Sequence, residues 1–451
     1  MSNRTYFGSK LGVILATAGS AVGLGNIWRF PFMTGHNGGA AFILLYLGCV
    51  FLLGIPGMIA EFIVGRHGGS NAARAYRKVG GRLPWGFTGY LGVFTSMVIL
   101  GFYAVVAGWC LQYLFASFAG SLKGDAGYVT DYFRSFSSHP WKPALWAIAF
   151  VGLTHFVVAK GVKDGIEKAS KLLMPTLLVL LLVIVVASCS LPGAGKGVEF
   201  LLKPDFSKLS AEVMLEALGQ AFFSLSLGTA CLCTYSSYFS RKIRLARSAT
   251  QIALMDSGIA ILAGLMIFPA AFAVGVSPDS GPSLIFITLP NVFQQAFSSV
   301  PIVGYIISIL FYFLLALAAL TSTISMHEIG TAFFHEELHV SRQAGAWVVT
   351  VACGVLAVLC SLSMGAVPSL QVMGNNLLDA CDKLTAQYLL PIGSLLTCLM
   401  VGWYLPKKLV HDQLTNWGTL RGNFYHVFLF LVRFVCPLGI IAIFLRQLGI
   451  I

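Results

Sequence analysis

Long apolar runs constrain this chain more than any other feature of its sequence. A helix needs roughly 20 apolar residues to cross about 30 Å of hydrocarbon. Runs near that length occupy residues 11–35, 40–65, 87–119, 144–160, 168–190, 212–239, 249–276, 303–334, 344–362, 377–404 and 424–446. With 57% apolar and only 10% charged residues, the chain lacks the polar surface of a soluble domain. We therefore predict an all-α integral membrane protein with eleven transmembrane helices.

The basic residues indicate how the chain is oriented. If the N-terminus lies in the cytosol, 19 of the 29 Lys and Arg residues fall in inner loops. The positive-inside rule then predicts a multi-pass protein of the cell (inner) membrane, with a cytosolic N-terminus and an external C-terminus. The net charge of +12 is carried largely by those inner loops, so we expect no nucleic-acid partner.

Two of the predicted spans contain residues that break a helix in mid-membrane. The first span reads GSAVGLGN at residues 19–26, and the sixth reads FFSLSLGT at residues 222–229. Backbone in hydrocarbon must satisfy its own hydrogen bonds, so such a break is tolerated only where it lines a cavity or a binding site. Paired broken helices in two inverted repeats are typical of a transporter site at the membrane midplane. The alternative is that these small residues only allow close helix packing.

This pairing predicts one transporter domain over residues 1–451. Its first inverted repeat covers residues 11–190, its second covers residues 212–404, and residues 424–446 form an extra C-terminal helix. Ionisable residues inside the apolar runs favour the same function, because each is costly there unless it is paired or solvated. We expect Glu61 and Glu328 to bond backbone amides that the broken helices free.

The first span carries a long motif that also suggests a family. Residues 19–31 (GSAVGLGNIWRFP), followed by NGGA at residues 37–40, resemble the first-helix signature of the neurotransmitter:sodium symporter family. The resemblance continues through Glu61, residues 220–228 and residues 320–322, and covers essentially the whole chain. It is strongest to the bacterial eleven-helix sodium-coupled transporters of hydrophobic amino acids. It implies the leucine-transporter fold and sodium-coupled symport by alternating access, in a monomer in the lipid bilayer that is not an enzyme.

The resemblance also implies the positions of two co-transported sodium ions and of the substrate. The first ion would take the carbonyl of Ala21, the side chains of Asn26, Ser224 and Asp256, and the substrate carboxylate. The second would take the carbonyls of Gly19, Val22 and Ala318 and the hydroxyls of Thr321 and Ser322. The amino-acid substrate would lie between them, lined by Ser20, Ala21, Val22, Gly23, Gly25, Ile99, Tyr103, Phe223, Ser224, Ser226, Thr229, Ser322 and Met326. Tyr103 would donate its hydroxyl to the substrate carboxylate, and Phe223 would form a lid.

Gates on both sides of the site follow from the same resemblance. Arg29 and Asp382 would form the outer gate, and Arg4 and Glu336, helped by Tyr238, the inner one. The spacing of Gly165 and Pro175 resembles a glycine–proline pair that lets the fifth helix unwind and admits water to the second sodium site.

The substrate class follows from what the implied pocket lacks. Monoamine carriers of the family hold an aspartate in the first helix, and here Gly23 stands in that place. The substrate must then bring its own carboxylate, as an α-amino acid does. Ile99, Phe223 and Met326 offer no charge to an ionic side chain, and Thr229 and Ser20 enlarge the cavity. We predict a neutral apolar or aromatic amino acid.

Asp256 bears on chloride dependence. Chloride-dependent relatives carry asparagine at this position and serine at the position of Ala260, and they hold the anion with counterparts of Tyr46, Gln220 and Ser224. A permanent carboxylate can balance the sodium charge instead, so we predict chloride-independent transport. The alternative is that Asp256 only caps the cytosolic end of the seventh span.

Two other functions compete with transport. Residues 335–339 read HEELH, the zinc-protease pattern in which two histidines share one helix face, and an intramembrane zinc metalloprotease is the enzyme alternative. A catalytic zinc needs a third protein ligand, and none is identifiable. The other alternative is an amino-acid sensor that binds without transporting.

Overall fold

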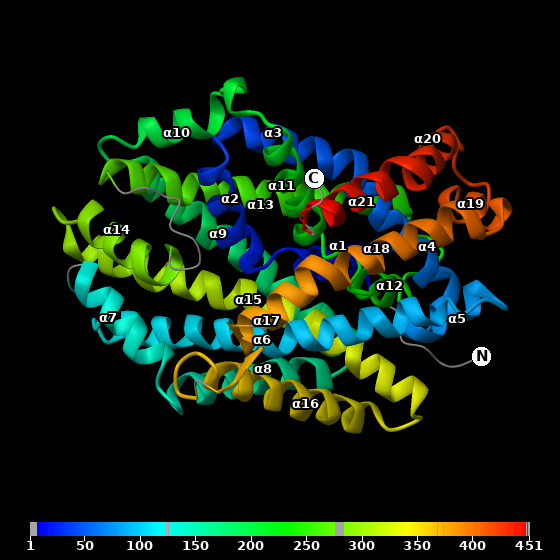
Figure 1. The fold of residues 1–451 in the computed structure, drawn as a ribbon, viewed down its shortest axis with the longest axis horizontal. Helices are drawn as coiled ribbons and strands as arrows, with labels where there is room; N and C mark the ends of the chain where they lie inside the picture. Colours follow the sequence, from blue (N-terminus) through cyan, green and yellow to red (C-terminus); the bar gives the residue numbers. More distant parts are fainter. Residues whose placement is uncertain are drawn as a thin grey trace.

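The chain folds into a bundle of long helices, shown in Figure 1 as a computed structural model. The structure describes residues 7–122, 124, 126–275, 284–367, 369–372, 374–447 and 449. Within these residues nine helices are long and apolar enough to cross a membrane, and a bent pair brings the number to ten. The chain is therefore mostly helical and multi-pass, as predicted, whereas the count of eleven spans is not confirmed.

The helices of the first half follow the predicted runs closely. The first span is the bent pair, α1 (Lys10–Ala21) and η1 (Gly25–Arg29) with α2 (Phe30–His36), whose halves meet at 55°. The next spans are α3 (Ala40–Cys49), η2 (Val50–Gly54) and α4 (Ile55–Gly68), then α6 (Gly86–Phe118), α8 (Lys142–Ala159), and η3 (Val162–Glu167) with α9 (Lys168–Cys189). Shorter elements connect them: α5 (Ala72–Gly80), α7 (Ala126–Ser137), α10 (Gly195–Leu202) and η4 (Phe206–Lys208).

The second half begins with the other broken span. It consists of α11 (Ala211–Ser224) and α12 (Cys231–Ser236), each too short to cross a membrane alone. The following spans are α13 (Leu245–Ala273), α15 (Pro301–Glu337), α16 (Arg342–Leu362), α17 to η7 (Leu377–Tyr404), and α20 to α21 (Tyr425–Gln447). Between them lie η5 (Leu284–Thr288), α14 (Leu289–Ala296), α19 (Lys407–Leu414) and a two-stranded hairpin, in which β1 (Gln371–Val372) pairs antiparallel with β2 (Asn375–Asn376).

Proline explains a repeated irregularity of these spans. Six π-helical turns end two residues before a proline, at Pro31, Pro56, Pro290, Pro391, Pro406 and Pro437. A proline cannot donate a backbone hydrogen bond, and its ring crowds the carbonyl four residues earlier. The residue before it instead donates five residues back, as Phe30 does to Gly25 and Cys436 does to Leu431. At Pro31, Pro56, Pro391 and Pro437 the widened turn thus lets a membrane helix continue past a proline, whereas at Pro406 the helix ends.

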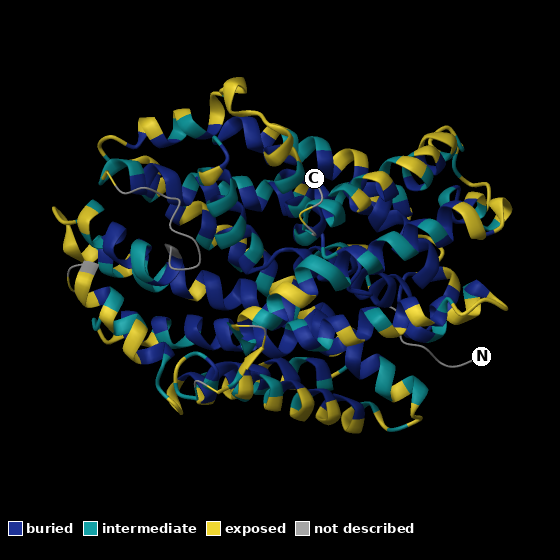
Figure 2. Cartoon of the chain, in the orientation of Figure 1, coloured by how far each residue is buried: buried dark blue, intermediate teal, exposed yellow. Residues whose placement is uncertain are grey.

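Burial separates a central group of helices from an outer shell. Figure 2 shows dark, buried residues along α6, α13 and α15 and exposed ones along the outer side of α16. The exposed side chains of α16 include Trp347, Val351 and Val355, which are apolar as a lipid-facing surface requires. The short helices α5, α19 and α20 lie at one end of the bundle, and α7, α10 and α14 lie at the opposite end (Figure 1). Both broken spans cross the buried centre.

Candidate functional site

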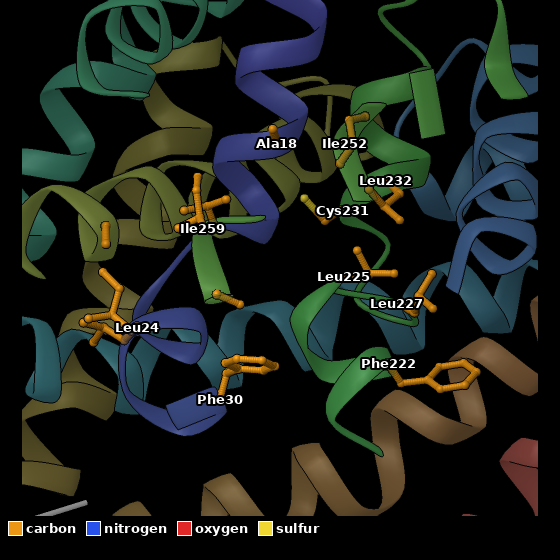
Figure 3. Close-up of a cluster of buried hydrophobic side chains, with 14 of the residues drawn as sticks. Ala18, Leu24, Phe30, Phe222, Leu225, Leu227, Cys231, Leu232, Ile252 and Ile259 are labelled. Atoms are coloured by element: carbon orange, nitrogen blue, oxygen red, sulfur yellow. The ribbon is translucent and has the colours of Figure 1, made fainter. Parts of the chain in front are cut away.

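Both mid-membrane breaks predicted from the sequence are present. The α1 helix ends at Ala21, Val22 is extended (φ −71°, ψ 110°), and helical structure resumes at Gly25. In the sixth span residues 225–230 are unwound, with the backbone of Ser226, Gly228 and Ala230 at positive φ. Gly228 is required there, since a Cβ atom on it would lie 2.2 Å from the carbonyl oxygen of Leu390. Figure 3 shows Leu24 on the first broken span and Leu225 and Leu227 on the unwound segment of the sixth, and all three are buried.

Side chains from other helices satisfy the amides that the breaks expose. Glu61 of α4 accepts a hydrogen bond of 2.7 Å from the Gly228 amide, which confirms the role predicted for this carboxylate. The Gly23 amide donates to Asn26 Oδ1 at 3.0 Å, and the Leu24 amide donates to the Tyr103 hydroxyl at 3.0 Å. An unbonded amide would be costly in this apolar interior, so these three side chains hold the breaks open.

A first cluster of oxygen atoms lies between α1, α11 and α13. The carboxylate of Asp256 accepts hydrogen bonds from Asn26 Nδ2 (2.7 Å), Ser224 Oγ (2.6 Å) and the Tyr46 hydroxyl (3.3 Å). Asp256 and Asn26 are fully buried and Ser224 is nearly so. Asp256 therefore does not cap the end of α13, and among the described residues its hydrogen-bond donors are all neutral.

A second oxygen cluster lies between the first break and α15. Thr321 Oγ1 donates to the carbonyls of Val22 (3.1 Å) and Ala318 (2.9 Å), and Ser322 Oγ lies 3.3 Å from the Val22 carbonyl. Gly19 also faces this cluster, because a Cβ atom on it would lie 3.4 Å from Thr321 Cβ. Four of the five oxygen groups expected around the second sodium ion thus converge in one place.

The residues expected around the substrate come from five helices and meet beside the breaks. A Cβ atom on Gly23 would lie 2.3 Å from Ser322 Oγ and 3.0 Å from the Tyr103 hydroxyl. One on Gly25 would lie 2.9 Å from the ring of Phe223. Ser226 Oγ donates to the Ser20 carbonyl at 3.1 Å and joins the two breaks directly.

The remaining side of this region is largely apolar, with the hydroxyls of Tyr103 and Thr229 both engaged in hydrogen bonds to the breaks. Ile99, Tyr103 and Met326 pack in one cluster. The Thr229 hydroxyl is used inside the unwound segment, where it donates to the Ser226 carbonyl (2.7 Å) and accepts from the Cys231 amide (3.1 Å). Ile99 and Met326 offer an apolar surface that suits an uncharged ligand side chain.

The expected outer gate is not closed by a direct ion pair. The described residues show no contact within 4 Å between Arg29 and Asp382, although Asp382 lies close enough for its charge to act on Arg29. Instead the Arg29 guanidinium lies 4.2 Å from the centre of the Phe223 ring. A cation is attracted to the face of an aromatic ring, so Arg29 lies against the residue expected to cover the substrate.

The expected inner gate is resolved only in part, because Arg4 lies outside the described residues. Glu336 accepts hydrogen bonds from the amide (2.6 Å) and side chain (3.1 Å) of Asn71. The Tyr238 hydroxyl donates to Glu328 at 2.7 Å. The prediction that Glu328 bonds freed amides is wrong: Arg342 forms an ion pair with this fully buried carboxylate. The positively charged guanidinium neutralises this carboxylate, whereas a backbone amide can only donate a hydrogen bond to it.

Other charged groups at this end of the bundle were not predicted from the sequence. Glu337 bridges Arg74 (2.9 Å) and Arg77 (3.1 Å) of α5, and its hydrogen bond raises the pKa of Arg77. Glu167 of η3 accepts hydrogen bonds from the Gly8 amide (2.6 Å) and the Ser9 hydroxyl (2.8 Å), and pairs with Lys171. These ion pairs could have been expected from the sequence, because the carboxylates lie near the predicted inner loops, which are rich in arginine and lysine.

The HEELH segment lacks the surroundings of a zinc centre in the described part of the chain. His335 Nδ1 lies 2.7 Å from the carbonyl oxygen of Val340 at the end of α15. No group of three or more His, Cys, Asp or Glu side chains among the described residues could hold a metal ion. The segment is therefore the end of a long helix, and Glu336 and Glu337 bond to α5 and the residue before it.

Comparison with known proteins gives consistent results. The model of the sodium:neurotransmitter symporter family matches residues 4–133 and 129–450. An uncharacterized sodium-dependent transporter of Bacillus subtilis is 39% identical over 98% of this chain and 97% of its own length. A human sodium- and chloride-dependent GABA transporter is 26% identical over 96% of this chain and 79% of its own length. The crystal structure of MhsT in complex with L-phenylalanine superimposes with a TM-score of 0.89, at 40% identity over 98% of this chain and 99% of that one.

We predict that the buried pair of Glu328 and Arg342 stabilises the inner end of the bundle. The Arg342→Gln variant leaves a buried carboxylate without its cation and should lose about 3–5 kcal/mol of unfolding free energy. The Glu328→Gln, Arg342→Gln double variant should lose clearly less than the sum of the two single variants. Unfolding of the purified proteins in detergent measures this. Arg74→Gln, which breaks a more exposed pair, is the control and should cost about 1 kcal/mol or less. Additive losses would contradict the prediction.

Proposed function

The chain belongs to the sodium:neurotransmitter symporter family, whose members named above are sodium-dependent transporters, and we propose that it couples sodium entry to the uptake of neutral apolar or aromatic amino acids. It is a multi-pass membrane transporter and not an enzyme, and it uses sodium. We further propose that two sodium ions accompany each substrate molecule and that chloride is not needed. We also propose that the protein lies in the cell membrane with its N-terminus in the cytosol.

One observation carries this proposal: two oxygen clusters flank the break in the first span. The cluster at Asp256 combines a carboxylate with amide and hydroxyl groups, and the cluster at Thr321 combines hydroxyls with the Val22 and Ala318 carbonyls. Oxygen atoms of this kind suit a hard cation. Asp256 has only neutral donors around it among the described residues, so a sodium ion would supply the missing positive charge.

The substrate would lie between the two ions with its carboxylate at the first break. Tyr103 reaches this place, since its hydroxyl accepts from the Leu24 amide and can still donate its own proton to a carboxylate. The half-helix that begins near Gly25 directs backbone amides toward the same point, which favours negative charge there. Ile99, Met326 and Phe223 would receive an apolar side chain. The phenylalanine bound in MhsT supports this choice.

Coupling follows from shared ligands. Val22 and Ser322 belong to both the proposed second ion site and the substrate lining, and Ala21 and Ser224 belong to both the first site and the lining. The ion and substrate therefore stabilise the same arrangement of the breaks, and each raises the affinity for the other. Arg29 and Phe223 would close the outer side of the site. The hydrogen bonds of Glu336 and the ion pair of Glu328 would close its inner side, and the two sides would open in turn.

Uptake into proteoliposomes tests the proposed function. A sodium gradient should drive accumulation of labelled phenylalanine, tryptophan or leucine, and a potassium gradient should not. Binding of these amino acids without accumulation would favour a sensor, and no sodium-dependent binding of any neutral amino acid would contradict the proposed substrate class.

We predict that Thr321 and Ser322 hold the second sodium ion. Replacing both by alanine should raise the sodium concentration for half-maximal substrate binding at least about tenfold, because one contact to a charged group is worth about 1.5–3 kcal/mol. Scintillation proximity binding across a sodium series measures the change. The control is Thr323→Ala, whose hydroxyl faces Thr154 at 2.9 Å on another side of α15. An unaltered sodium dependence in the double variant would remove these residues from the site.

We predict that transport does not need chloride. The hydroxyls of Tyr46 and Ser224, which would otherwise be free for an anion, already donate to the Asp256 carboxylate. That carboxylate also balances the sodium charge, so wild-type uptake should be equal in chloride and in gluconate. The Asp256→Asn, Ala260→Ser double variant should gain stimulation by chloride. Loss of wild-type uptake in gluconate would show that Asp256 does not replace the anion.

A further inference from the structure

The last span carries one charged side chain in mid-helix that the transport site does not use. Arg433 is the only Lys, Arg, Asp or Glu between residues 424 and 445. It lies in the π-turn η8 (Leu431–Val435), toward the Tyr425 end of a span that is otherwise apolar. A charge in such a place is costly and marks a functional site unless the protein supplies a partner.

The protein offers the Arg433 guanidinium one hydrogen-bond acceptor and one aromatic ring. Its Nε–H donates to the Gly402 carbonyl, and its guanidinium lies 5.5 Å from the centre of the Trp403 ring. Trp403 Nε1 donates back to the Arg433 carbonyl at 3.2 Å and fixes the two helices to each other. Among the described residues no carboxylate lies within 4 Å of Arg433, and its two terminal nitrogens make no hydrogen bond. The positive charge and four N–H donors are therefore left for a ligand.

The surroundings of Arg433 face lipid. Trp403 is 58% exposed, Phe430 58% and Phe434 44%. Trp403 and Phe434 pack edge to face with their ring centres 5.4 Å apart, on the outer surface of the bundle. Tryptophan is enriched where a membrane helix reaches the headgroup level. Because Gly402 and Trp403 belong to the last turn of the tenth span, Arg433 lies beside the end of that span.

Further positive charge follows directly along the chain. Lys407 and Lys408 begin α19, both are exposed, and Arg421 in the next loop is exposed as well. A planar guanidinium binds two phosphate oxygens at once, and nearby lysines add attraction over a longer range. The chemistry that matches an arginine among exposed aromatic rings is a phosphate group attached to acyl chains.

We propose that Arg433, Trp403 and the adjacent lysines form a binding site for an anionic phospholipid, with the Arg433 guanidinium on the lipid phosphate and the acyl chains along Phe430 and Phe434. The bound lipid would lie against the exposed aromatic rings of the tenth and eleventh spans and neutralise Arg433. This site is separate from the substrate and sodium positions, and it requires no particular transported amino acid.

Retention of lipid by the purified protein tests the proposal. Wild-type protein in detergent, incubated with phosphatidylglycerol or with phosphatidylcholine of the same acyl chains, should retain phosphatidylglycerol preferentially in native mass spectrometry. Arg433→Gln should reduce this retention about fivefold or more, the factor that one basic residue contributes near an anionic surface. Lipid retention by the Arg433→Lys variant should lie between these two values, because lysine keeps the positive charge but lacks the planar guanidinium that binds two phosphate oxygens.

The control removes an arginine of the same kind elsewhere. Arg247 is exposed at the start of α13, and Arg247→Gln should leave retention within about twofold of wild type if attraction is specific to Arg433. An equal loss in both glutamine variants would overturn the site and show general attraction to charge. Unchanged retention in Arg433→Gln would overturn it as well.

A measurement on wild-type protein guards against a variant that fails to fold. Phosphatidylglycerol should raise the unfolding temperature more than phosphatidylcholine does, and more than inorganic phosphate at the same concentration. Equal protection by inorganic phosphate would show a site for the free anion and overturn the lipid assignment. Equal protection by phosphatidylcholine would show that the headgroup charge is not recognised.

Discussion

The structure depends on satisfying backbone amides where two helices stop inside an apolar bundle. An amide without a partner there is costly, so a break persists only if other residues supply acceptors. Glu61, Asn26 and Tyr103 supply them for Gly228, Gly23 and Leu24. The carbonyl of Val22 remains directed at Thr321 and Ser322. The residues that make the breaks tolerable thus also arrange the oxygen atoms on which the proposed ion binding rests.

Buried carboxylates are matched with different partners according to their place. Glu328 has an arginine, and Glu61 accepts from a backbone amide. Asp256 has amide and hydroxyl donors but no lysine or arginine among the described residues. A buried pair that is complete gains nothing from a mobile cation, whereas a buried carboxylate with neutral donors does. This difference separates Glu328, whose charge is already paired, from Asp256, which could still hold a cation.

The sequence was sufficient where a feature depends on neighbouring residues along the chain. The apolar runs, the two breaks and the need of Glu61 for a backbone partner all follow from local composition and the cost of burial. Partners that come from another helix were not predictable in this way. Arg342 was predicted only as an inner-loop charge, but it pairs with Glu328. Arg29 was expected to pair with Asp382, but its guanidinium lies against the ring of Phe223. Proline positions alone do not predict the π-turns, because Pro31 and Pro437 follow one whereas Pro175 lies inside an uninterrupted α-helix.

Glu167 shows how a local feature of the fifth span reaches the first. The segment around Gly165 forms the π-turn η3, while α9 continues through Pro175 without interruption. Within that turn Glu167 accepts from Gly8 and Ser9, and a Cβ atom on Gly12 would lie 2.2 Å from its carboxylate oxygen. The start of α1 therefore packs directly against η3 of the fifth span. Because the acceptor for Gly8 and Ser9 lies in η3, we expect an unwinding of this turn to weaken the contact that holds the start of α1.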